Sequence, residues 1–171
     1  PSGSVRGMSP LGIGPILKDR SATNYGLISC LSYLDDKGFG PSLVHRNGVT
    51  RARMFQEMGV AAQCNVSDDA SLAAALDILD TTLGTDLGNM KGDYVCGQYT
   101  LADACWAGVC QVAMNTGKGS AVSSRSKVNT WFAAVQSHPS TSKEAINPFS
   151  CMATKADHDA GSMREIRINT A

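Results

Sequence analysis

One short segment, residues 97–114, constrains the fold of this chain more than any other. Thr100 is a favourable residue just before a helix, because its hydroxyl can accept a hydrogen bond from a backbone N–H of the first turn that has no partner inside the helix. Asp103 can return a bond to the amide of Thr100 and lies at the positive end of the helix dipole. The pattern predicts a helix over residues 101–114, in which loss of the Asp103 side chain costs about 1–2 kcal/mol of stability.

The predicted helix has hardly any polar side. Its apolar residues are Ala102, Ala104, Cys105, Trp106, Ala107, Val109, Cys110, Val112, Ala113 and Met114. A helix that is apolar all round is buried in a larger protein. We therefore expect this helix at the centre of a helical domain, where Thr100, Asp103 and Trp106 have structural roles.

The hydrophobic spacing predicts further elements on both sides of this helix. Leucine and isoleucine recur at steps of three and four over residues 21–37, which indicates a helix that ends at Gly38. Residues 117–126, rich in glycine and serine, are expected to form a polar connection. The remaining expected elements are a short strand over 13–19 entered through Pro15, helices over 50–64 and 68–83, and a shorter helix that carries Val128, Trp131, Phe132 and Val135 and ends at His138-Pro139.

Charge and composition exclude several classes of function. The 171 residues carry 15 basic and 15 acidic side chains, spread without blocks, which argues against binding nucleic acid or a membrane through bulk charge. No apolar run reaches the ~20 residues that a membrane span needs. The 6 cysteines lack metal-ligand spacing and lie mostly in apolar patterns, which favours free thiols in a reducing compartment.

Several motifs occur in an order that is similar to a known family. Residues 97–103 (Gly-Gln-Tyr-Thr-Leu-Ala-Asp), followed by 127–135 and by His138-Pro139-Ser140, resemble the C-terminal domain of glutathione transferases. Residues 14–19 (Gly-Pro-Ile-Leu-Lys-Asp) resemble the Val-Pro-x-Leu-x-Asp segment of that family's thioredoxin-like half, where the proline bond is cis. The segments 33–37, 41–43 and 51–54 with Gln56 also follow the family's order, so the resemblance covers residues 13–149.

The resemblance implies a mainly helical fold. A helical bundle like the C-terminal domain of a glutathione transferase would be preceded by a short strand-plus-helix remnant of a thioredoxin-like domain. The implied division is an extended arm over 1–12, the truncated remnant over 13–40, the helical domain over 41–149 and a C-terminal tail over 150–171.

Three departures from the family bear on function. The strand–helix–strand that supplies the residue activating the glutathione sulfur has no counterpart before Ile13, since such a unit needs ~30 residues. Counting from Pro15, the Glu-Ser pair that holds the glutathione glutamyl group is replaced by Gly26 and Leu27. The remnant would also leave a sheet edge uncovered, which another chain could pair with.

The cysteines are weak candidates for thiol chemistry. Cys30, Cys105 and Cys110 fall at apolar helical positions and are interpreted as core residues. Cys96, near a loop, and Cys151, in the tail, are expected to be more exposed and are the better candidates for redox chemistry.

The other chemically active side chains form no recognisable site. His45, His138 and His158 lack a second ligand at helical or short-loop spacing, so no metal and no cofactor are predicted. Gly12-x-Gly14 is too short for a phosphate loop. Asp77 with Asp80, and Arg51 with Arg53, are interpreted as solvated surface pairs.

Two functions from different classes follow. The favoured one is a non-catalytic helical adaptor or linker subunit, which contacts other protein subunits through residues 1–12, the tail and the open sheet edge. The absence of a leading methionine fits an imported subunit of a plastid or mitochondrial complex, photosynthetic or respiratory. The alternative is a glutathione transferase or peroxidase whose N-terminal strands are absent from this sequence; a small-molecule binding protein is a third option.

Overall fold

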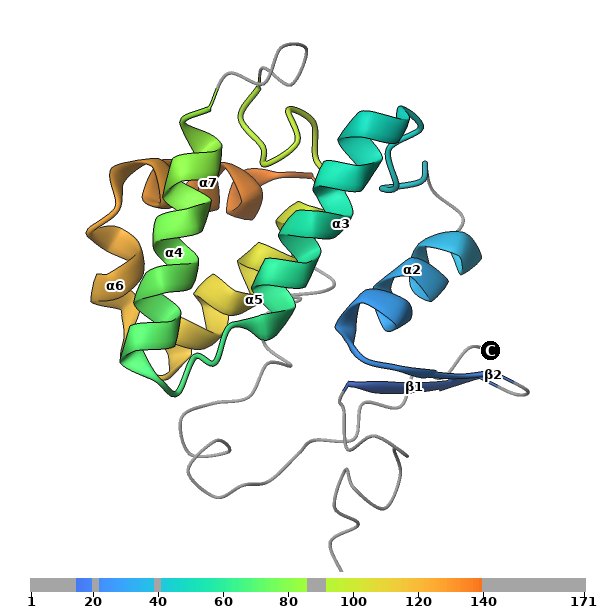
Figure 1. Cartoon of the computed structure of the whole chain (residues 1–171), viewed down its shortest axis with the longest axis horizontal. Helices are drawn as coiled ribbons and strands as arrows, with labels where there is room; N and C mark the ends of the chain where they lie inside the picture. The colour runs from blue at the N-terminus through green and yellow to red at the C-terminus, as the bar shows by residue number, and fades with distance from the viewer. Residues whose placement is uncertain (1–14, 20–21, 39–40, 86–91, 140–171) are drawn as a thin grey trace, which may run out of the picture. The chain divides into compact units, whose positions relative to one another are not determined.

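The computed structural model describes residues 15–19, 22–38, 41–85 and 92–139 (Figure 1). This part of the chain is mostly helical, with a small two-stranded sheet before the helices, which confirms the predicted fold class. The elements are β1 (Ile16–Asp19), β2 (Ala22–Tyr25), α2 (Leu27–Lys37), α3 (Gly48–Gln63), α4 (Asp69–Leu83), α5 (Leu101–Asn115), α6 (Gly119–Ser123) and α7 (Ser126–Ser137).

The described residues belong to two compact units. The first comprises those between 15 and 64 and between 92 and 106, and the second those between 65 and 85 and between 107 and 139. Helix α5 contributes to both units. The expected arm over 1–12 and tail over 150–171 lie outside the described residues.

The first unit begins with a hairpin that was not predicted. Strand β1 pairs antiparallel with β2, with Ile16 opposite Tyr25 and Asp19 opposite Ala22. The helix expected over 21–37 is therefore wrong in its first part, because residues 22–25 are a strand and α2 begins at Leu27. Threonine and tyrosine within β2 favour extended backbone, and this local preference prevails where the leucine spacing has not yet begun.

Gly26 makes the change from strand to helix. Its backbone φ is 81°, a conformation that costs side-chain-bearing residues energy and glycine very little. Its N–H donates to the carbonyl of Pro15 at 2.8 Å. The end of β2 and the start of α2 are thus fixed against the residue that leads into β1.

Helices α3 and α4 lie close to their predicted places and begin at side-chain caps. Asn47 Oδ1 accepts from the N–H groups of Val49 at 2.9 Å and Thr50 at 3.2 Å, so α3 starts slightly earlier than predicted. Asp68 Oδ1 accepts from Ala70 N at 3.0 Å at the start of α4. These side chains satisfy amides that have no partner within their helices.

Helix α5 ends in a glycine motif at the predicted place. Gly117 has a φ of 81°, its N–H donates to Met114 O at 3.2 Å, and Lys118 N donates to Ala113 O at 2.8 Å. These two bonds are those of a Schellman motif, which stops a helix by satisfying its last carbonyls.

The second unit packs α4, α6 and α7 against one another. Helix α6 was not predicted, because its segment was interpreted as a polar connection; Val122 is buried within it. Helix α7 buries the side chains predicted for it, which are Val128, Trp131, Phe132 and Val135. Figure 1 shows the short α6 beside α4. None of the helices in the described ranges has both the length and the apolar run that a bilayer crossing requires.

Candidate functional site

The start of α2 is the place where the family resemblance puts a ligand. Gly26 is the residue before the helix and Leu27 is its first residue, and no side chain caps this end. Neither residue carries a carboxylate or a hydroxyl. The backbone here has the form of a turn into a helix, but the side chains of these two residues supply no polar group for a charged ligand.

Cys30 lies one turn further along α2 and is buried, as predicted. Its thiol donates to Pro15 O at 3.6 Å and to Asn24 O at 3.5 Å. Burial raises the pKa of this thiol, against a smaller lowering effect of the backbone at Leu17. A thiol that is held protonated by burial is a poor nucleophile. Cys30 therefore packs α2 against the hairpin and is not poised for thiol chemistry.

A second cluster surrounds Asp103, which is fully buried at the start of α5. Its Oδ2 accepts from Thr100 N at 2.9 Å, the return bond that the spacing predicts. The Thr100 hydroxyl donates to the same oxygen at 3.1 Å. Oδ1 accepts from Val95 N at 2.9 Å, a bond that the sequence pattern did not indicate. One carboxylate thus holds both the helix start and the loop before it.

Glu57 is a second buried carboxylate, which the sequence reasoning missed. Its Oε1 lies 3.0 Å from Arg53 Nη2, and its Oε2 accepts from Trp106 Nε1 at 3.3 Å. The interpretation of Arg53 as a solvated surface residue is wrong, because Arg53 forms an ion pair with the Glu57 carboxylate, and Glu57 is only 1% exposed. Arg51 is exposed, as expected. The available signal was the Arg53–Glu57 spacing of four along a helix.

Cys96 lies near these two carboxylates. The expectation that Cys96 is exposed is wrong, because its side chain is buried. Burial, with the nearby charge of Asp103, raises its pKa to about 11 despite a hydrogen bond with Thr100. Burial raises the pKa of Cys105 to about 12. These thiols stay protonated at neutral pH, which disfavours them as redox groups. Cys151 lies outside the described residues.

The histidines and aspartates do not gather into a metal site within the described ranges. His45 Nδ1 accepts from Asn47 N at 3.0 Å, and His138 follows the last residue of α7. No group of three or more potential ligands occurs among the described residues; His158 is outside them. Asp77 is exposed but pairs with Arg125. For Asp80 the solvated interpretation is wrong, since its Oδ1 is buried and has no hydrogen-bond partner among the described residues.

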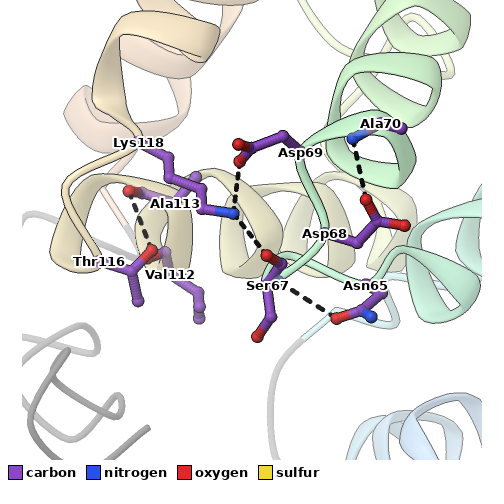
Figure 2. Close-up of polar contacts among 9 residues, drawn as sticks. All are labelled: Asn65, Ser67, Asp68, Asp69, Ala70, Val112, Ala113, Thr116 and Lys118. Atoms are coloured by element: carbon purple, nitrogen blue, oxygen red, sulfur yellow. Dashed lines mark hydrogen bonds and ion pairs between the residues drawn. The ribbon is translucent and has the colours of Figure 1, made fainter. Parts of the chain in front are cut away.

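Two basic residues fasten the ends of α6 to α4. Figure 2 shows Lys118 Nζ donating to Ser67 O at 2.7 Å and pairing with Asp69 Oδ1 at 2.6 Å. Arg125 Nε donates to Asp77 Oδ1 at 2.8 Å, and its Nη2 donates to Ala73 O at 3.2 Å. These contacts explain why a segment of glycine and serine is helical here, and they are structural.

The described polar clusters therefore support the helices rather than present reactive groups. No protein-family model matches the chain, and no curated protein matches it. Among solved structures, 16 chains match. One is the crystal structure of poplar glutathione transferase F1, with 23% sequence identity and a TM-score of 0.59, over 77% of this chain and 72% of the poplar chain. At this identity the match bears on fold alone, and it shows that this chain has a glutathione transferase-like fold.

Proposed function

We propose that this chain is a non-catalytic adaptor that uses a glutathione transferase-like helical fold to bind other proteins in a larger complex. One observation carries the proposal. The start of α2 has Gly26 and Leu27 where the resemblance implies a carboxylate and a hydroxyl that hold the glutamyl end of glutathione.

The energetic cost of this replacement is large. The amine and carboxylate of glutathione would lose their water without gaining these two partners. An unpaired buried polar group costs about 1–3 kcal/mol, and more when it is charged. Each missing partner therefore weakens binding by roughly tenfold or more.

The buried thiols support the same function. The pKa values of Cys96 and Cys105 lie at about 11 and 12, so neither offers a thiolate at neutral pH. Within the proposal, residues 41–149 are the adaptor domain and residues 13–40 a strand-plus-helix segment. Among the described residues the sheet has two strands, so each strand has one edge that a partner chain could pair with.

Glutathione binding and turnover test the proposal. The purified chain is titrated with glutathione by isothermal calorimetry and assayed for conjugation of a chlorodinitrobenzene-type substrate, beside an active glutathione transferase. We expect no binding heat at millimolar glutathione and no conjugation above the uncatalysed rate. Saturable binding together with conjugation would overturn the proposal in favour of a transferase or peroxidase.

A further inference from the structure

Helix α3 carries apolar side chains on its exposed side as well as on its buried side. Met54, Met58 and Ala61 are buried. On the other side Val49 is 72% exposed and Phe55 is 36% exposed. A soluble helix normally turns its apolar residues to the core and its charged residues to water. The outer side of α3 departs from that pattern.

Three exposed apolar residues and the half-buried Gly59 form one stripe. Val49, Ala52, Phe55 and Gly59 follow one another at steps of three and four, which places them on one side of the helix. The stripe spans about 15 Å at 1.5 Å per residue. A Cβ added to Gly59 would meet nothing within 4 Å, so a partner could approach the backbone closely there.

The exposed charges of residues 41–67, the segment that contains α3, have a single sign. Between residues 41 and 67 the one acidic residue is Glu57, and its carboxylate is buried against Arg53. Arg46 and Arg51 are exposed. The whole chain has no net charge, so this basic and apolar surface is a local feature and not a consequence of composition.

We propose that this surface, the α3 face (Arg46, Val49, Arg51, Ala52, Phe55 and Gly59), binds an acidic amphipathic helix of a partner protein. The inference rests on the proposed adaptor function and names its docking surface. The apolar side of the partner helix lies along the stripe, with anchors at steps of three and four. Its acidic residues face Arg46 and Arg51, and this complementarity selects acidic over basic partners.

The probe is a fluorescein-labelled model helix of about 20 residues, long enough to form a helix in water. It has leucines on one side and glutamates on the other, and a matched peptide has lysine at every glutamate. Anisotropy is measured with the full chain. We expect the acidic peptide to bind at least about tenfold more tightly than the basic one, with the difference reduced by salt.

Three variants locate the binding surface. Val49→Asp puts a charge in the stripe and is expected to weaken binding of the acidic peptide about tenfold or more. Asp is favourable in the first turn of a helix, so this variant should keep its fold. Arg46→Glu/Arg51→Glu is expected to reverse the preference between the peptides. Ile78→Asp, at an exposed apolar residue of α4, is the matched control and should leave binding unchanged.

The outcomes separate this inference from the proposed function. The inference that the α3 face is the docking surface would be overturned by any of three results. These are equal binding of the two peptides, an unchanged preference in the double arginine variant, and an equal loss of binding in Ile78→Asp. Sedimentation that shows a dimer abolished by Val49→Asp would overturn it as well, because a second copy would then cover the face. Conjugation activity is measured separately. A protein that conjugates the substrate and also binds the acidic peptide would refute the non-catalytic function but not the docking surface on the α3 face.

Discussion

Removing the carboxylate of Asp103 should destabilise the protein much more than a helix cap alone would suggest. The side chain is fully buried and accepts bonds from Val95 N, Thr100 N and the Thr100 hydroxyl. In Asp103→Ala, both backbone N–H groups stay buried without this acceptor. Only the hydroxyl can rotate to another partner.

The magnitude follows from these contacts. The bond from Thr100 N is the cap bond, whose loss costs about 1–2 kcal/mol, and the buried Val95 N–H that also loses its acceptor costs about 1–3 kcal/mol. We therefore expect a decrease of roughly 2–5 kcal/mol in the free energy of unfolding. This exceeds the cost of about 1–2 kcal/mol for a cap alone, because the bond to Val95 adds a second unpaired amide.

Urea unfolding followed by circular dichroism measures this loss. A lower midpoint with an unchanged slope would report stability alone. Asp103→Asn keeps one acceptor oxygen and should fall between wild type and Asp103→Ala. The matched control is Asp93→Ala, at an exposed aspartate of the same loop, which should change stability by less than about 0.5 kcal/mol. A loss below about 1 kcal/mol in Asp103→Ala would refute the reasoning.

Three further outcomes are expected. Glu57→Ala should cost about 2–4 kcal/mol in urea unfolding, because the buried Trp106 N–H loses its acceptor and the ion pair with Arg53 is removed, and Glu57→Gln should cost less because its amide oxygen can still accept from Trp106. Gly59→Ala should raise the melting temperature, since a Cβ there meets nothing within 4 Å and alanine in a helix is favoured over glycine by about 1 kcal/mol. The pKa of Cys96 is about 11 in the fold against 9.0 unfolded. The unfolded chain therefore binds fewer protons between these values, so the free energy of unfolding should fall as pH rises from 9 to 11, and less so in Cys96→Ala.

The elements that the sequence predicted well are those whose signals are local. Helix α5 has its start at Thr100, its return bond at Asp103 and its stop at Gly117, all within or beside the helix. Strand β2 (Ala22–Tyr25) was not predicted because its residues directly precede the leucine pattern of α2 and were included in that helix. The strand depends on antiparallel pairing with β1 across a short turn. The spacing of apolar residues along a helix carries no information about such pairing.

The interactions that the sequence reasoning missed depend on distant residues. A helical Arg53–Glu57 pair is usually exposed, and its burial here requires Trp106, which lies 49 residues from Glu57. Helix α6 likewise depends on Lys118 and Arg125 reaching α4. Lys118 and Arg125 lie within the glycine- and serine-rich segment, but Ser67 and Asp77, which they contact, are 51 and 48 positions away, so single-sequence patterns could not reveal these contacts.

The two buried carboxylates should also act at different stages of folding. The bond from Val95 to Asp103 closes a loop of 8 residues, and loops of this length close in about 10–100 ns. The bond from Trp106 to Glu57 joins residues 49 apart and must await a larger arrangement of the chain. Substitution of Asp103 should therefore slow folding, whereas substitution of Glu57 should mainly speed unfolding. The cap of α5 would then be a nucleus from which the rest of its unit assembles.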